Sequence, residues 1–240
     1  MSCRIPATRR RLLQALVGGG MTLAAARVSA LVPTPRQTRG PFYPRSFPPD
    51  TDNDLVHVDG AGTTARGTVT DIAGRVLERD GTPVAGALVE IWQCDANGRY
   101  HHSRDYGAAP DPGFQGYGRM NADDDGRYTF RTIRPVPYSG RTPHIHFAVH
   151  APDGRELVTQ MYVEGEPRNG RDWILGNIGD EAARRAVIVA LVPASDGEAS
   201  LSGRFDIVLA GAGGSAAATP AMGDARELDD ARAAWLRRRS

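Results

Sequence analysis

The sequence predicts an all-β fold: an antiparallel β-sandwich with an irregular N-terminal arm and a C-terminal segment that could form a short helix. Between residues 65 and 210, short runs of alternating apolar and polar residues follow one another, as expected of strands with one buried face. Turn sequences separate these runs, among them "RDGTPVAG" at 79–86 and "DDDGRY" at 123–128. The chain of 240 residues is 40% hydrophobic and contains 28 Gly and 17 Pro, which is typical of one soluble domain rich in turns.

The first thirty residues have the three parts of an export signal. A basic start at Arg9, Arg10 and Arg11 precedes an apolar stretch, which ends at Ala30 in the small residues of a cleavage site. An arginine pair in this position is typical of the twin-arginine type, and the apolar stretch is too short to span a membrane. We therefore expect residues 1–30 to be a signal peptide. The mature protein is then expected to be periplasmic or secreted, with no membrane anchor.

The charge balance provides no basic face for nucleic acid. The formal net charge is +1, and loss of residues 1–30 would remove five arginines and leave 24 basic against 28 acidic residues. Cys3 would leave with the signal and Cys94 would remain alone, so no internal disulfide is expected. The stability of the mature protein must then come from its core, to which a bound metal could add.

The rest of the chain divides into an arm, a domain and a tail. Residues 31–64 are rich in proline and polar residues, so we expect an extended arm there. Residues 65–210 are expected to form the β-sandwich domain. Residues 211–240 combine a flexible linker with a segment that could form an apolar-striped helix. The expected strands lie in the runs 67–77, 87–94, 127–133, 144–150, 157–164, 186–192 and 204–210, and a helical turn is expected at the start of the stretch 180–191.

Two histidines in the run 144–150 could share a ligand. Side chains alternate along a strand, so His144 and His146 point to the same face, about 6–7 Å apart at the backbone. Two imidazoles in this arrangement can converge on one metal ion. A His-x-His pair alone is also compatible with a surface or buried structural role.

Two tyrosines could complete such a site. Tyr138 lies in the loop just before the histidine strand, and Tyr100 follows an Asn-Gly turn after an earlier strand. A trivalent cation can hold tyrosine as a phenolate, although the ordinary pKa of the phenol is near 10. Two phenolates and a hydroxide would balance the charge of Fe(III), and two neutral imidazoles would bring the ligands to five. Each tyrosine taken singly is compatible with a packing role.

Several separated motifs resemble those of the intradiol ring-cleavage dioxygenases, in particular the protocatechuate 3,4-dioxygenase type. The likeness runs from Thr38 to Gly211 and includes "TRGPFYP", "GTPVAGALVEIWQCDANGRY", "DDDGRYTFRTIRPVPY", "RTPHIHF", "TQMYVEGEP" and "GRFDIVLAG". The resemblance implies a β-sandwich that holds one non-haem Fe(III). It also implies a catechol-type substrate that O2 cleaves between the two hydroxyl-bearing carbons, to give a cis,cis-muconate-type diacid.

The same resemblance assigns roles to particular residues. The metal ligands it implies are Tyr100, Tyr138, His144 and His146. It implies that Tyr138 leaves the metal when substrate arrives. Arg141 matches an arginine that stabilises negative charge on the ring, and Gln160 matches a glutamine that lines the same pocket.

The chain departs from the protocatechuate pattern in one loop. Only five residues separate Tyr138 from His144, where protocatechuate enzymes have a longer loop with aromatic residues. The identity of the catechol therefore stays open, as does a homo-oligomeric assembly. His101, His102 and His150 have no counterpart among the ligands, and we expect them at the surface or at the edge of the pocket.

Three alternatives are compatible with parts of the sequence. A non-catalytic β-sandwich module of the transthyretin-like or adhesin-like kind would share the strand and turn pattern. A zinc or copper hydrolase could use His101 and His102 together with His144 and His146. An extradiol enzyme would need Fe(II) with two histidines and a carboxylate, and no acidic residue has the matching context.

Overall fold

A computed structural model of the chain describes residues 30–138, 140–195 and 197–211. The signal peptide and the C-terminal helix predicted from the sequence lie outside these residues. The described residues form two five-stranded sheets. The first sheet contains β1 (Val69–Leu77), β4 (Arg127–Ile133), β8 (Leu191–Pro193), β9 (Leu201–Arg204) and β10 (Ile207–Val208). The second contains β2 (Leu88–Trp92), β3 (Tyr117–Asn121), β5 (His144–His150), β6 (Glu156–Val163) and β7 (Ile188–Val189), in the order β3-β2-β5-β6-β7.

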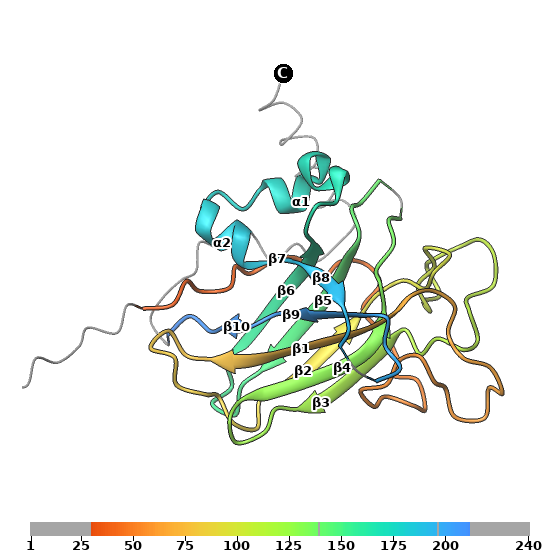
Figure 1. Ribbon diagram of the computed structural model, residues 1–240, viewed down its shortest axis with the longest axis horizontal. Coiled ribbons are helices and arrows are strands. Elements are labelled where there is room, and N and C mark those ends of the chain that lie inside the picture. Colours follow the sequence, from red (N-terminus) through yellow and green to blue (C-terminus); the bar gives the residue numbers. More distant parts are fainter. Residues whose placement is uncertain (1–29, 139, 196, 212–240) are drawn as a thin grey trace, which may run out of the picture.

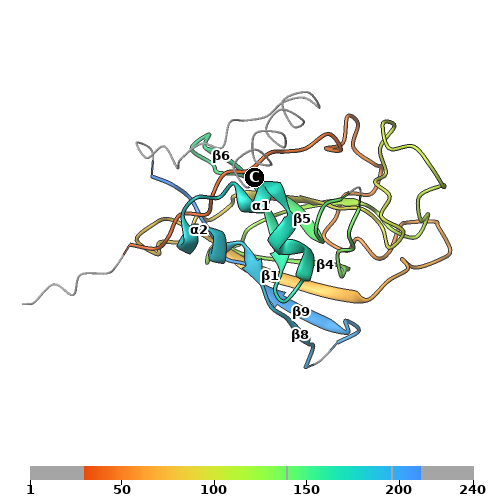
Figure 2. The same ribbon diagram turned by 90° about the horizontal axis from the view of Figure 1, so that it is seen from above.

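The two sheets stack face to face and enclose one main core, as Figures 1 and 2 show. Ile72 of β1 and Phe130 of β4 contribute from the first sheet, and Ile91 of β2 and Phe147 of β5 from the second. All four side chains are fully buried, which is the arrangement that an alternating strand pattern predicts for an inner face. The predicted all-β sandwich is therefore confirmed.

The sheets are mixed, whereas the sequence suggested antiparallel pairing throughout. β9 and β10 pair with β1 in parallel, and β7 pairs with β6 in parallel. Parallel neighbours need a crossover connection. Between β6 and β7 this connection is helical: it consists of η1 (Pro167–Arg171), α1 (Trp173–Gly176) and α2 (Glu181–Ala186), which lie at one end of the sandwich (Figure 1).

The expected strand boundaries differ from the observed ones in the last third of the chain. The run 186–192 is divided between the end of α2, β7 and β8, and the run 204–210 is divided between the end of β9 and β10. The helical turn expected before residue 186 is α2, whose first turn is capped by Asp180. Strand β3 was not predicted.

The N-terminal arm covers the outer face of the second sheet (Figure 2). The backbone N–H of Gln37 donates to the carbonyl of Val158 on β6 at 2.8 Å, and the Gln160 side chain donates to the carbonyl of Thr38 at 3.0 Å. Because the arm lies on one face and the core on the other, six of the seven residues of β5 are buried. An unbroken burial of this kind gives the two histidines of β5 a dry environment.

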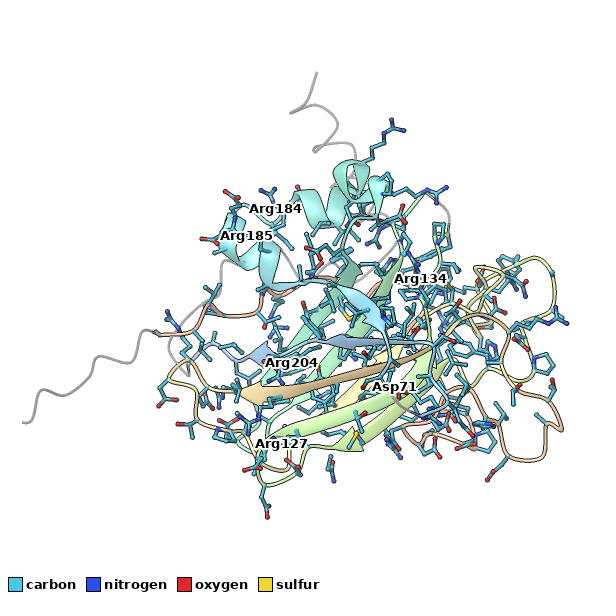
Figure 3. All side chains as sticks on the ribbon, in the orientation of Figure 1. Asp71, Arg127, Arg134, Arg184, Arg185 and Arg204 are labelled. Atoms are coloured by element: carbon cyan, nitrogen blue, oxygen red, sulfur yellow. The ribbon has the colours of Figure 1, made fainter. Side chains whose placement is uncertain are left out.

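The outer face of the first sheet is polar. Asp71, Arg127 and Arg204, labelled in Figure 3, lie on strands of this sheet. Arg131 of β4 donates to Asp71 of β1 at 3.2 Å, an ion pair between neighbouring strands. Partly exposed pairs such as this one typically contribute about 0–1 kcal/mol. We assign this face no chemistry.

Candidate metal centre

The two histidines of β5 lie together on the arm side of the second sheet. Their ring centroids are 4.9 Å apart, and His144 and His146 are only 1% and 2% exposed. The strand register explains the position, since His146 lies opposite Trp92 of β2 and Gln160 of β6. The pair predicted from the strand alternation is therefore central in the sheet and buried.

Both predicted tyrosines come to the same place from separate loops. The ring of Tyr138 lies 5.5 Å from that of His144 and 5.0 Å from that of Tyr100. The ring of Tyr100 in turn lies 6.2 Å from that of His146. Each ring thus neighbours the next, and the four rings form a closed circuit. We call these four side chains the tyrosine-histidine cluster.

Short polar contacts fix the loop that carries Tyr100. The Asp95 carboxylate accepts the backbone N–H groups of Asn97 and Arg99, at 2.8 and 3.0 Å. The Asp105 carboxylate accepts the backbone N–H of Tyr100 at 2.7 Å and the Arg99 guanidinium at 2.7 Å. These contacts restrict the backbone on either side of Tyr100, so its ring is directed toward the histidines.

A tight turn fixes Tyr138 and Arg141 relative to each other. The backbone N–H of Arg141 donates to the carbonyl of Tyr138 at 2.7 Å, and Gly140 has φ of +77°, a conformation that favours glycine. Thr142 and Pro143 then lead from this turn directly into β5.

Three members of the cluster carry a buried polar atom without a hydrogen-bond partner in the described part of the chain. These atoms are Tyr100 Oη, His144 Nε2 and His146 Nδ1. One unpaired buried polar atom costs about 1–3 kcal/mol. Three unpaired polar atoms in one cluster are expected if a bound cation accepts their lone pairs. Phenol oxygen and imidazole nitrogen are donors that fit a transition-metal ion.

The histidines have the protonation state that a metal ligand requires. His144 Nδ1 lies 2.6 Å from the carbonyl of Thr142, which can only accept, so Nδ1 carries the proton and Nε2 keeps its lone pair. Burial, followed by the charge of Arg141, holds the pKa of His144 well below its ordinary value. Burial, followed by His144 and Arg141, lowers the pKa of His146 in the same way. Both imidazoles are therefore neutral near pH 7.

The tyrosines need a cation to become phenolates. Burial, and then the neighbouring Tyr138, raises the pKa of Tyr100 well above its ordinary value. Burial also raises the pKa of Tyr138, against the opposing charge of Arg141. A bound metal ion is the kind of charge that reverses such shifts.

Arg141 and Gln160 lie beside the cluster and contact each other. Arg141 Nη2 donates to Gln160 Oε1 at 2.8 Å, and Arg141 Nε donates to Asp172 Oδ2 at 2.7 Å. Burial alone would lower the pKa of Arg141, but Asp172 and the hydroxyl groups of Tyr162 and Tyr138 outweigh it, so the pKa lies above its ordinary value. The cluster thus has a permanent, buried positive charge next to it.

The remaining histidines lie outside the cluster. The His101 ring packs 6.2 Å from that of Phe114 and borders a cavity of about 340 Å³, to which none of the six predicted site residues contributes. The His102 ring lies 5.7 Å from that of Phe42, and His150 Nε2 lies 3.0 Å from Glu90. In the described part of the chain, His101 and His102 do not join His144 and His146 in a group that could hold a metal ion, as the hydrolase alternative would need.

Carboxylates do not replace the tyrosines in this site. Among residues 30–138, 140–195 and 197–211, no group of three or more His, Cys, Asp or Glu side chains is arranged to hold a metal ion. The oxygen donors beside the histidine pair are those of the two tyrosines, Tyr100 and Tyr138.

Three residues that the sequence did not suggest support the cluster. Trp92 stacks on His146 with ring centroids 4.8 Å apart and planes 8° from parallel, and Phe42 of the arm stacks on Tyr100 at 4.7 Å. Asp172 holds Arg141, as described above. Strand pairing could have suggested Trp92, because it lies opposite His146, but no local pattern indicates the other two.

Comparison with known proteins gives the family to which the chain belongs. The sequence model of the family described as Dioxygenase matches residues 38–211, which is most of the chain. The chain belongs to this family, and within it to the intradiol ring-cleavage dioxygenases. The resemblance identified from the separate motifs is thereby confirmed.

The curated relatives include enzymes named for several catechols. The chain is 40% identical over 149 residues to the protocatechuate 3,4-dioxygenase beta chain of Burkholderia cepacia, covering 58% of this chain and 63% of the relative. It is 34% identical over 165 residues to catechol 1,2-dioxygenase 2 of Acinetobacter lwoffii, covering 61% and 57%. It is 32% identical over 188 residues to 6-chlorohydroxyquinol 1,2-dioxygenase of Cupriavidus pinatubonensis, covering 71% and 62%. The chain thus spans about three fifths of the length of these relatives.

Solved structures share the fold. The dioxygenase domain of a dioxygenase carbohydrate-binding protein fusion from Streptomyces sp. SirexAA-E is 32% identical, with a TM-score of 0.57, covering 75% of this chain and 99% of that one. Catechol 1,2-dioxygenase from Pseudomonas arvilla C-1 is 26% identical, with a TM-score of 0.58, covering 80% and 67%.

Proposed function

We propose that the protein is an intradiol dioxygenase that binds one non-haem Fe(III) in the tyrosine-histidine cluster and cleaves a catechol-type ring with O2. The observation that carries the proposal is the closed circuit of two tyrosines and two histidines with three unpaired buried polar atoms. Family membership supports the reaction class, and the names of the relatives support an ortho-dihydroxy aromatic substrate.

The donor set suits ferric iron. Phenolates are hard, anionic ligands that stabilise Fe(III) over Fe(II), and two of them with one hydroxide would neutralise its charge. The neutral imidazoles of His144 and His146 would complete the set without adding charge. When bound, the ferric ion supplies a Lewis acid and a template for the two catechol oxygens.

Residues of the chain then accept the substrate proton and stabilise the charge on the ring. Tyr138 is only partly buried and lies at the turn before β5, so its phenolate oxygen is the one placed to take a proton from the entering catechol. Tyr100 is 2% exposed and held on both sides by its loop, so we assign it a permanent ligand role. Arg141 provides positive charge where the ring becomes electron-rich, and Gln160 orients it.

The reaction adds both atoms of O2 and loses nothing. The bond between the two hydroxyl-bearing carbons breaks, the ring carbons are oxidised, O2 is reduced, and the product is a cis,cis-muconate-type diacid. The test is to incubate purified protein in air with catechol, protocatechuate and hydroxyquinol, and to measure O2 uptake and product mass. We expect one O2 consumed per substrate and a product heavier by the mass of O2. A hydroxymuconic semialdehyde, or no turnover of any catechol by iron-loaded protein, would contradict the proposal.

We also propose that the protein is exported by the twin-arginine route, with cleavage after Ala30. The arginine pair and the apolar stretch of residues 1–30 support this, and that route can carry a protein already folded around its metal. In the part of the chain that the structure describes, no helix is long and apolar enough to cross a membrane. N-terminal sequencing of periplasmic protein should begin at Leu31. Mature cytoplasmic protein that keeps Met1 would contradict export.

A further inference from the structure

Asp172 is a buried carboxylate that the chemistry described so far does not use. It lies between η1 and α1, in the crossover that follows β6, and its side chain is 0% exposed. Its Oδ2 accepts from Arg141 Nε at 2.7 Å and from the backbone N–H of Thr142 at 3.0 Å. Its Oδ1 accepts from the backbone N–H groups of Ile174 and Leu175, each at 3.0 Å. The Oδ2 contacts thus connect the crossover to the turn that carries Arg141, while the Oδ1 contacts cap α1 within the crossover.

The contacts of Arg141 leave one end of its guanidinium for a ligand. Nε is bonded to Asp172, while Nη2 donates to Gln160 at 2.8 Å and lies 3.4 Å from the second oxygen of Asp172. Within the described residues these contacts occupy Nε and Nη2, and the Tyr162 hydroxyl also interacts with the guanidinium. Nη1 is the remaining donor group, and the planar guanidinium fixes its direction once the other two nitrogens are held.

We propose that Asp172 is the positioning residue of Arg141: by holding the Nε edge of the guanidinium, it directs Nη1 toward the substrate ring. This inference rests on the proposed function for the role of Arg141. Arg141 and Asp172 are far apart in sequence and both are buried. Only the folded chain therefore brings them into contact.

Helix capping does not account for the carboxylate. Asp180 also caps its helix, α2, by accepting the Ala183 N–H at 2.8 Å, but it is exposed, and among the described residues its carboxylate contacts no arginine side chain. Asparagine and serine cap a helix about as well as aspartate. A buried ion pair also has to offset the desolvation of both charges, which capping does not require. The charge at position 172 is therefore better explained by its partner, Arg141.

The test compares Asp172→Asn with Asp180→Asn, its matched control. Asparagine keeps the size and the capping oxygen but removes the charge that aligns Arg141. We expect Asp172→Asn to keep the iron and the visible spectrum of the substrate-free protein, and to slow the reaction of the substrate complex with O2 by about 10–100-fold, as loss of an orienting partner typically does. Asp180→Asn should react at the wild-type rate. If Asp172→Asn does not fold, Asp172→Ser keeps the cap and takes its place.

A double-mutant cycle separates positioning from a merely structural role. If Asp172 acts through Arg141, the Asp172→Asn change should slow the O2 step in the wild-type background and leave it unaltered in the Arg141→Ala background. Equal slowing in both backgrounds would overturn the proposal. A wild-type O2 rate in folded, iron-loaded Asp172→Asn would also overturn it.

A measurement without metal or substrate keeps this inference distinct from the proposed function. In 15N-labelled, metal-free protein, the Nε–H signal of Arg141 can be assigned by its loss in Arg141→Lys. We expect slow hydrogen exchange at this group in the wild type and in Asp180→Asn, and fast exchange in Asp172→Asn. Unchanged exchange in Asp172→Asn would overturn the positioning role even if the protein proves to be a dioxygenase. Changed exchange in a protein that cleaves no catechol would leave the contact established and refute the proposed reaction instead.

Discussion

Substitution of Gly40 by alanine tests how closely the arm fits the metal centre. Gly40 lies in the arm with φ of +72°, and a Cβ built on it would lie 3.2 Å from Cε1 of His146. Gly60 has almost the same backbone conformation, with φ of +76°, but a Cβ there would meet no atom within 4 Å. The pair Gly40→Ala and Gly60→Ala therefore shares the backbone strain and differs in the contact with His146.

Both alanine variants should lose stability because of their backbone conformation. Left-handed conformation costs a residue with a Cβ about 1–2 kcal/mol. For a protein of this size each kcal/mol lowers Tm by about 2–4 °C, so both variants should melt about 2–8 °C below the wild type.

The effect expected of Gly40→Ala alone is a loss of iron affinity through His146. A contact of 3.2 Å requires the neighbour to give by a few tenths of an ångström, and Trp92 stacked 4.8 Å away restricts the His146 ring. Displacing a ligand by loss of its support typically costs about 10–100-fold in metal affinity. We expect that loss in Gly40→Ala alone, measured by iron content after dialysis against a graded chelator. Equal iron affinity in the two alanine variants would refute the inference that the arm packs against the metal ligand.

Five further outcomes follow from the site and its surroundings. Tyr138→Phe should retain iron and some colour but bind catechol about 10²–10⁴-fold more slowly in stopped-flow, because a positioned proton acceptor is lost. Tyr100→Phe should hold ferric iron less tightly and show an altered spectrum in every state, as metal analysis and absorption would show. Arg141→Ala should keep metal and colour but slow the O2 step in single turnover by about 10²–10³-fold, and a wild-type rate would remove its assigned role. His144→Ala should lose most of its iron, whereas iron content at the wild-type level would exclude it as a ligand. Burial, followed by Asp95, raises the pKa of Cys94 to about 12, so at pH 8 only about one thiol in 10⁴ is ionised. Iodoacetamide should therefore label Cys94 after unfolding but hardly in the native protein, and the labelling rate should rise toward high pH. Peptide mapping of the labelled protein checks this.

Much of the fold could be predicted because local pattern and burial agree in it. β1, β2, β4, β5 and β6 alternate or carry continuous apolar runs, and each was expected within a few residues of its observed bounds. β3 was missed because "YGRMN" holds a glycine and two exposed polar residues, and it is a strand through pairing with β2. The parallel pairings of β7, β9 and β10 depend on how the chain returns after the crossover, which no local pattern encodes.

The site likewise contains residues that a local sequence pattern could predict and residues that it could not. Alternation along one strand was enough to place His144 and His146 on one face. Tyr100 and Tyr138 come from loops, so their approach to the histidines rested on the resemblance to the family. The contacts of Phe42 and Asp172 with the site could not be predicted, because each joins segments far apart in sequence through the path of the arm or of the crossover.

The most direct test of the central claim is the metal content and visible spectrum of the purified protein, before and after anaerobic addition of catechol. We expect about one iron per chain, ferric as isolated, with a visible band from phenolate-to-iron charge transfer that shifts when catechol binds. Colourless protein that contains stoichiometric zinc, or a coloured protein whose spectrum does not change with any catechol, would contradict it.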